Sequence, residues 1–158
     1  MDIERVPRVV ADHREEKSEI PEILRAMGVA VEFRMLDVAD YVVADRVAVE
    51  RKSAHDFVSS VYDGRLFRQA ADLAASYEVP VIVVEGDPAD LESLFRNEKA
   101  YYGALAALVM DLGVRTIFTS GPAQTAVFLE RAARRAEEGG MGGPRVVKRI
   151  RGDISQAQ

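Results

Sequence analysis

The order of the short apolar segments is the sequence feature that most constrains how this chain can fold. Residues 6–11 and 79–84 are short valine-rich runs, as in strands that are buried in a sheet. Residues 29–36 alternate apolar and polar side chains, which is typical of a half-buried strand. Residues 41–43 and 47–50 predict two further strands, and residues 44–46 predict the tight turn that joins them. The first half of the chain is therefore expected to contain an antiparallel unit.

Helical segments are predicted between and after these strands. The first follows Ser18, a predicted helix cap, carries Pro21 in its first turn and stops at Gly28. Other predicted helices cover residues 54–61, 65–77, 98–112 and 122–138, and a last strand covers 114–119. Because strands alternate with helices beyond the antiparallel unit, we expect an α/β layered domain with a mixed sheet.

The bulk properties exclude some classes of protein. A length of 158 residues suits one domain, and the absence of Cys excludes a disulfide framework and a thiolate metal site. No apolar run approaches the roughly 18 residues of a membrane span, and the charged N-terminus lacks the apolar stretch of a signal peptide. We therefore expect an intracellular, cytoplasmic protein. The net charge of −5 argues against a protein that coats nucleic acid, but not against a nuclease whose site collects carboxylates.

The residues with most chemical content lie between positions 36 and 56. Asp40 opens one predicted strand, and Glu50-Arg51-Lys52 ends the next one ten residues later. A hairpin places these strands side by side, so Asp40 and Glu50 can approach each other. Residues two apart in a strand point to the same face, so Glu50 and Lys52 are expected on one face and Arg51 on the other.

This arrangement suits the hydrolysis of a phosphodiester bond. Two carboxylates can bind a hard cation such as Mg²⁺, which prefers oxygen ligands and activates a bound water. A neighbouring Lys can orient or deprotonate the attacking water. An Asp followed by a spaced Glu-x-Lys is the general pattern of restriction-endonuclease-like folds.

A longer motif surrounds these residues. Residues 49–56 (VERKSAHD) resemble the V/I-E-R-K-x-x-x-D motif of the XPF/Mus/Hef nuclease family. Residues 39–41 match that family's Gly-Asp-Tyr with Ala39 in place of Gly, and residues 12–15 match its Asp-x-Arg-Glu. Further similarity covers Ser59 to Gln69, Ile82 to Gly86 and Gly103 to Phe118. The resemblance extends to about residue 138 and is greatest to archaeal Hef and XPF.

The resemblance implies a restriction-endonuclease-like three-layer domain with a central mixed sheet, a nuclease domain over residues 1–138. Residues 139–158 are expected to be a Gly-rich linker and basic tail, with the helix-hairpin-helix domain of other family members absent. The implied activity is Mg²⁺-dependent cleavage of branched DNA, such as flaps and forks, near the junction of single and double strands, with Mn²⁺ as a substitute ion. The implied metal ligands are Asp40, Glu50 and the backbone carbonyl of Arg51.

The resemblance also implies roles for other residues. Lys52 would act on the attacking water, and Asp12 and Asp56 would extend the acidic cluster. Arg14, Arg51 and Arg65 would engage phosphate or hold the carboxylates in place. The residues alone leave structural roles open, because Asp12 with Arg14 also suits a strand-end ion pair and Asp56 suits the first turn of any helix.

The family further implies a homodimer formed through the late helices, at about residues 100–112 and 123–137. The apolar stripe from Tyr101 to Leu112 is equally typical of a buried helix face. Two other functions remain open: a non-catalytic DNA-binding and dimerisation subunit of such a nuclease, and a junction resolvase of the same fold.

Overall fold

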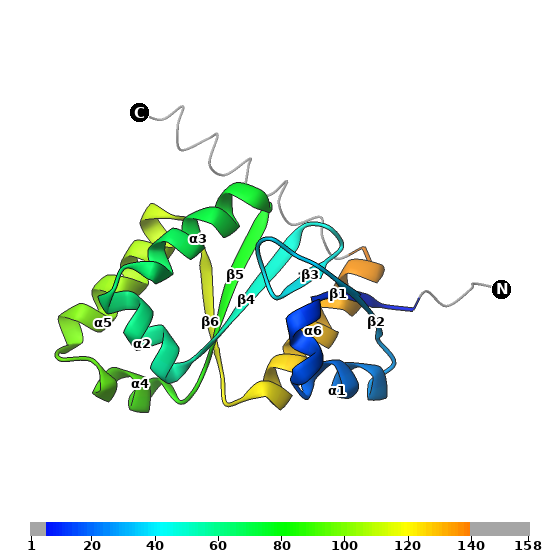
Figure 1. The fold of residues 1–158 in the computed structure, drawn as a ribbon, viewed down its shortest axis with the longest axis horizontal. Coiled ribbons are helices and arrows are strands. Elements are labelled where there is room, and N and C mark those ends of the chain that lie inside the picture. The colour runs from blue at the N-terminus through cyan, green and yellow to red at the C-terminus, as the bar shows by residue number, and fades with distance from the viewer. Residues whose placement is uncertain (1–5, 140–158) are drawn as a thin grey trace.

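A mixed six-stranded sheet forms the centre of the computed structural model, which describes residues 6–139 (Figure 1). The strands lie in the order β2-β1-β3-β4-β5-β6. β3 is antiparallel to both of its neighbours, β1 and β4, whereas β1 pairs with β2, and β4 with β5 and β6, in parallel. The strands are β1 (Arg8–Asp12), β2 (Ala30–Arg34), β3 (Tyr41–Val43), β4 (Val47–Ser53), β5 (Val79–Glu85) and β6 (Arg115–Thr119).

Helices cover both faces of this sheet. One face packs against α1 (Ile20–Ala26) and α6 (Pro122–Glu137), and its core includes Leu24 and Leu129. The other face packs against the remaining helices, and its core includes Phe57 and Leu73. These helices are α2 (Ala54–Tyr62), α3 (Arg65–Ser76), α4 (Pro88–Leu94), α5 (Glu98–Ala106) and the π-helix Ala107–Asp111 that continues α5. The predicted layered domain with a mixed sheet is thus confirmed.

The β3–β4 hairpin is the predicted antiparallel unit, and its turn explains how the strands are aligned. Ala44 and Asp45 both have a φ of 56°, and the Arg46 N–H donates to the carbonyl of Val43 at 3.2 Å. Two central residues with positive φ define the type I′ turn, whose twist matches that of paired strands. The hairpin therefore sets which residues of β3 and β4 face each other.

Three local features differ from the prediction. A 3-10 helix, His13–Lys17, follows β1, and α1 begins after Glu19 rather than at Ser18, although the Ser18 hydroxyl accepts the Ile20 N–H. Helix α4 was not predicted, yet its start has an ordinary signal: the Asp87 side chain accepts the Ala89 N–H and Pro88 opens the first turn.

The boundary predicted at residue 138 lies at the end of the described part of the chain. Helix α6 ends at Glu137, and the predicted linker and basic tail, apart from Gly139, lie outside the described residues. Within residues 6–139, no helix combines the length and the apolar character that a membrane crossing requires.

Candidate active-site pocket

Strand β4 sends alternate side chains to opposite faces of the sheet. Val47 and Val49 belong to the core under α1 and α6, whereas Ala48 belongs to the core under α2 and α3. Glu50 and Lys52 therefore lie on the same face of the sheet as Ala48, and Arg51 lies on the same face as Val49, as the sequence predicts. One short segment thus supplies an acid and a base to one face and a guanidinium to the other.

Asp40 is held against the end of β4 by its own backbone and side chain. Its N–H donates to the carbonyl of Val49 at 2.8 Å, and its Oδ2 accepts the N–H of Arg51 at 2.8 Å. Ala39, just before it, is buried with a φ of 86°, a left-handed conformation that favours glycine. This is the position at which the motif has Gly, so the structure retains the glycine-like bend although the residue is Ala.

A polar pocket of about 180 Å³ contains both acids of the motif. Asp40 and Glu50 line it from the sheet, and α3 lies across it. Its lining consists of Arg14, Asp37, Val38, Ala39, Asp40, Glu50, Gln69 and Asp72.

The two acids in this pocket are electrostatically coupled. Burial is the largest influence on Asp40 and raises its pKa to about 6, against the N–H bond from Arg51. Burial and then the charge of Asp40 raise the pKa of Glu50 to about 7, whereas Lys52 and Arg14 oppose this shift. Two carboxyl groups that are costly to ionise together form a site that a cation would stabilise.

Asp12 holds a neighbouring loop and Arg14 in place. It is fully buried, and its Oδ1 accepts the Leu36 N–H at 2.9 Å. Its Oδ2 accepts the N–H of Arg14 at 3.2 Å and the Arg14 Nε–H at 2.5 Å. Burial alone would raise the pKa of Asp12, but these hydrogen bonds outweigh it and lower the pKa to about 2. Asp12 is therefore an ionised anchor that presents the largely exposed Arg14 side chain at the pocket.

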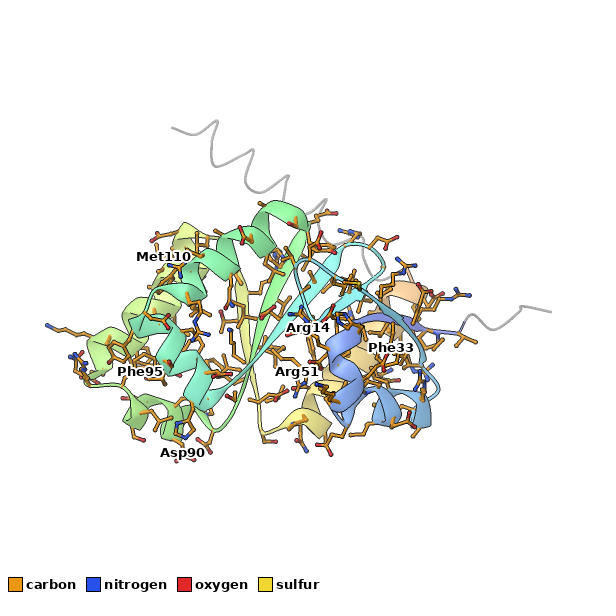
Figure 2. All side chains as sticks on the ribbon, viewed as in Figure 1. Arg14, Phe33, Arg51, Asp90, Phe95 and Met110 are labelled. Atoms are coloured by element: carbon orange, nitrogen blue, oxygen red, sulfur yellow. The ribbon has the colours of Figure 1, made fainter. Side chains whose placement is uncertain are left out.

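Arg51 connects five elements on the opposite face. Its guanidinium donates to both carboxylate oxygens of Glu85 on β5, at 2.8 and 2.9 Å, and to Glu15 at 2.7 Å. Glu15 also accepts from the Tyr41 hydroxyl at 2.6 Å, and Glu85 accepts from Thr125 of α6 at 2.7 Å. The largely buried side chain of Arg51 thus links the 3-10 helix, β3, β4, β5 and α6, and only its backbone lies beside Asp40. Figure 2 shows Arg51 and Arg14 in the middle of the molecule, between the two groups of helices.

The remaining predicted residues lie in three different settings. Lys52 is only 7% exposed and shares the face of Glu50, whose pKa its charge lowers. Asp56 is exposed in the first turn of α2, where Ser53 caps the helix, and it does not line the pocket. Arg65 also lies outside the pocket lining, at the start of α3, with its Nε 3.3 Å from Asp63. The pocket therefore gathers Asp40, Glu50 and Arg14, with Lys52 adjacent.

The donor atoms around this pocket suit Mg²⁺ better than a softer ion. All the potential ligands that line it are carboxylate or amide oxygens, and neither His13 nor His55 takes part. Among residues 6–139, no three His, Asp or Glu side chains converge as a complete metal-binding group. A cation at Asp40 and Glu50 would therefore complete its shell with neutral oxygens and water, as Mg²⁺ commonly does.

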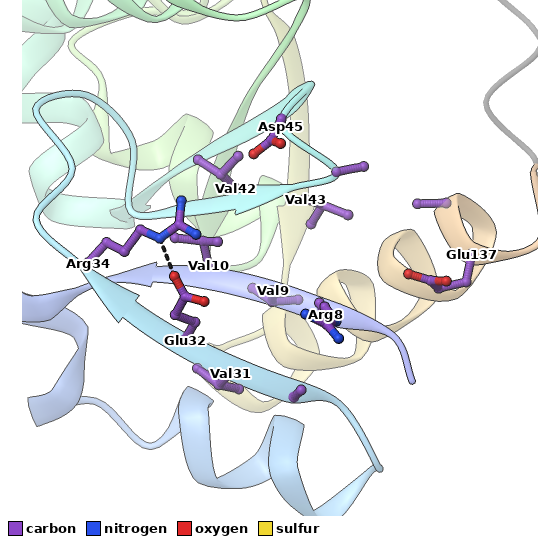
Figure 3. A pocket seen from close by; sticks show the side chains of 13 residues that line it. Arg8, Val9, Val10, Val31, Glu32, Arg34, Val42, Val43, Asp45 and Glu137 are labelled. Atoms are coloured by element: carbon purple, nitrogen blue, oxygen red, sulfur yellow. Dashed lines mark hydrogen bonds and ion pairs between the residues drawn. The ribbon is translucent and has the colours of Figure 1, made fainter. Parts of the chain in front are cut away.

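A second hollow differs from this pocket in chemistry. It lies beside β2, β1, β3 and the end of α6, and valines form much of its wall (Figure 3). Its Glu32 and Arg34 pair with each other, as Figure 3 shows. Because Glu32 is already paired with Arg34, we assign this hollow no chemistry.

The late helices are partly exposed. Val109 and Met110 of the π-helix are 57% and 80% exposed, and Val127 of α6 is 48% exposed. Tyr101 and Leu129, by contrast, are buried in the cores of the chain itself. The apolar stripe between Tyr101 and Leu112 is therefore divided between core and surface.

Sequence reasoning did not single out Asp37, Gln69 or Asp72 as pocket residues. Gln69 and Asp72 are three residues apart, which places them on the same face of α3. That spacing was visible in the sequence, but nothing local indicates that this face of α3 covers the end of the β3–β4 hairpin.

Residues 11–132 match the ERCC4 domain. The chain is 40% identical over 134 residues to the 3'-flap repair endonuclease Xpf of Saccharolobus solfataricus. The aligned region covers 85% of this chain and 58% of that protein. It is 37% identical over 86 residues to the DNA repair endonuclease XPF of Mus musculus, over 54% of this chain and 9% of that protein. The chain therefore spans under two thirds of the length of these relatives.

Solved structures show the same similarity in three dimensions. XPF from Aeropyrum pernix in complex with DNA superposes with a TM-score of 0.76 and 43% identity, over 84% of this chain and 66% of that chain. A second structure of XPF from Aeropyrum pernix superposes with a TM-score of 0.77 and 45% identity, over 82% and 61% of the two chains. The fold is therefore the restriction-endonuclease-like fold of these nuclease domains.

Proposed function

Because the chain belongs to the XPF/ERCC4 family of structure-specific DNA repair endonucleases, we propose that it is a Mg²⁺-dependent endonuclease domain that cleaves flap- or fork-type DNA near the single-strand/double-strand junction. The observation that carries the proposal is the pocket in which Asp40 and Glu50 lie together, with Lys52 on the same face and Arg14 at its wall.

Each residue of this group has a role in phosphodiester hydrolysis. Asp40 and Glu50, with the backbone carbonyl of Arg51, would hold Mg²⁺, or Mn²⁺ as a substitute. The chemistry that the ion supplies when bound is activation of water and neutralisation of charge on the phosphate. Lys52 shares the face of Glu50 and would act on the attacking water, either orienting it as an ammonium or deprotonating it as the neutral amine.

The positive groups act on the DNA backbone. Arg14 is fixed by Asp12 yet exposed, so its free N–H groups can bind a phosphate oxygen. Arg65 lies outside the pocket and would contact phosphate farther along the duplex. The Arg51 side chain is fully engaged with Glu15 and Glu85, so its contribution is to hold β4 in place.

A cleavage assay with matched variants tests the proposal. A labelled flap or fork should be cut with Mg²⁺ by the wild type, whereas Asp40→Asn and Lys52→Ala should lose about 100-fold or more in rate. Asp45→Asn is a control, because Asp45 lies in the hairpin turn at φ 56° and Asn adopts that conformation readily. It should cut at the wild-type rate.

The same assay separates the competing functions. If the folded wild type binds the substrate but cuts nothing with Mg²⁺ or Mn²⁺, the chain is a non-catalytic DNA-binding subunit and our proposal is wrong. Faster cutting of a four-way junction than of a flap would indicate a junction resolvase instead.

The late helices support a homodimer as the working form. Among the described strands, β6 pairs only with β5, and the π-helix and α6 contact it from opposite faces. Val109, Met110 and Val127 are exposed on these two helices. An unpaired strand edge between exposed apolar side chains is typical of a surface that a partner covers.

A further inference from the structure

The side chain of Gln69 is an unusual member of the pocket. Its Oε1 is buried, yet no hydrogen-bond donor reaches it. Thr116 carries the only other buried side-chain acceptor or donor without a partner within residues 6–139, and it does not line this pocket. Buried polar atoms in native proteins nearly always have a partner, so an orphaned acceptor that lines a polar pocket indicates a missing ligand.

The position of Gln69 fits a role beside the two acids. Its helix, α3, lies across the face of the sheet that presents Glu50, and Gln69 lines the pocket together with Asp40 and Glu50. Asp37 and Asp72 also line the pocket, but no three His, Asp or Glu side chains lie close enough to form a metal-binding group in the described part of the chain. A hard cation held by two carboxylates needs further oxygen atoms, and an amide oxygen is one of its ordinary donors.

We propose that Gln69 is a third oxygen donor of the cation site formed by Asp40 and Glu50, and thereby positions the cation for the reaction. The inference rests on the proposed metal-dependent function. With Gln69 bound to the cation, α3 would form one wall of the site and the β3–β4 hairpin would form the other.

Calorimetric titration of Mn²⁺ and Mg²⁺ into the DNA-free chain tests the inference without relying on activity. Gln69→Leu keeps a similar volume but lacks the oxygen, and we expect its affinity for either ion to fall about tenfold or more, as is usual when a supporting donor is lost. Gln69→Glu has an oxygen at both terminal positions, whichever way the amide of Gln69 points, and we expect it to bind at least as tightly as the wild type. Gln124→Leu, an exposed glutamine on α6, should bind like the wild type.

Thermal unfolding distinguishes this role from a structural one. Without metal, Gln69→Leu should melt no lower than the wild type, because it removes a buried acceptor that has no partner. With Mg²⁺, its gain in melting temperature should be smaller than that of the wild type. A lower melting temperature without metal, combined with unchanged ion affinity, would make Gln69 a structural residue and overturn the inference.

The outcomes also separate this inference from the proposed function. Equal ion affinity of wild type, Gln69→Leu and Gln69→Glu refutes the role of Gln69 alone. If the wild type binds neither ion, the metal-dependent function fails and the role of Gln69 fails with it.

Discussion

Asp40 and Glu50 are held in a setting that disfavours their charged forms. Burial raises the pKa of Asp40 to about 6, and burial together with the charge of Asp40 raises the pKa of Glu50 to about 7. Folding therefore favours their protonated forms. The stability that they contribute is fully present below their ordinary pKa values of 3.8 and 4.5, and is lost as the pH rises through 6 to 7.

This linkage predicts how stability depends on pH in the absence of metal. The free energy of unfolding should fall by on the order of 4 kcal/mol between about pH 5 and about pH 8, since each pKa unit corresponds to about 1.4 kcal/mol and both acids titrate in this range. Urea unfolding in a chelator at both pH values measures it. The Asp40→Asn, Glu50→Gln double variant should lose most of this slope, and Mg²⁺ should stabilise the wild type more at the higher pH. Equal slopes in wild type and variant would contradict the assigned environment of the two acids.

The sequence predicted best which way the individual side chains of β4 point. The hairpin and the two-residue alternation placed Glu50 and Lys52 on one face and Arg51 on the other, because the strand period is short and local. The sequence did not reveal that Arg51 ties Glu15 to Glu85, or that Asp12 caps the loop at Leu36. These contacts join residues 24 to 36 positions apart, and no local pattern encodes them.

Strand β4 depends on its neighbours through Arg51. The guanidinium and its two carboxylate partners are all 15% exposed or less, so their ion pairs are poorly screened by solvent. Removing one member of such a group leaves charges buried without a partner, at a cost of about 3–5 kcal/mol.

We therefore expect Arg51→Met to lower the free energy of unfolding by about 3 kcal/mol, although methionine conserves much of the volume. Chemical denaturation measures the change. Arg65→Met is a matched control, because the Arg65–Asp63 pair is exposed and should contribute about 0.5 kcal/mol or less. Similar losses in the two variants would show that Arg51 does not tie the elements together.

The longer helices were predictable from the sequence, whereas the short ones were missed even where, as at Asp87 and Pro88, a start signal is present. Ser53 caps α2 and Gly64 precedes α3, as the sequence indicated. Helix α4 and the 3-10 helix after β1 were missed because each is short and shows little apolar periodicity. The π-turn within residues 107–111 has no local signature in the sequence.

Within residues 6–139, the sheet ends in two edge strands, β2 and β6, and β6 is the edge that lies next to the late helices. β6 has a partner on one side only, and exposed apolar side chains flank it on the π-helix and α6 (Met110 is labelled in Figure 2). A single chain does not determine which molecule covers this edge, because that depends on how chains assemble.

The proposed homodimer predicts a specific effect of charge at this surface. Val127→Asp combined with Val109→Asp should convert a dimer to a monomer in sedimentation equilibrium, because two carboxylates would have to be desolvated in the interface. Met35→Asp is a matched control, since Met35 is 82% exposed on the opposite edge of the sheet, after β2. A wild type that is monomeric at tens of micromolar, roughly the range of a weak interface, would exclude this dimer.

Side chains alternate between the two faces along β4, so the residues needed for catalysis and those needed for folding lie at alternate positions. Even positions carry the chemistry, and odd positions connect the framework, so substitutions at the two sets should affect catalysis and folding separately. A shift of one residue within the strand would exchange the two sets at once, turning Arg51 toward the pocket and both Glu50 and Lys52 toward the opposite core. A single-residue insertion or deletion between Val47 and Lys52 should therefore impair catalysis and folding together.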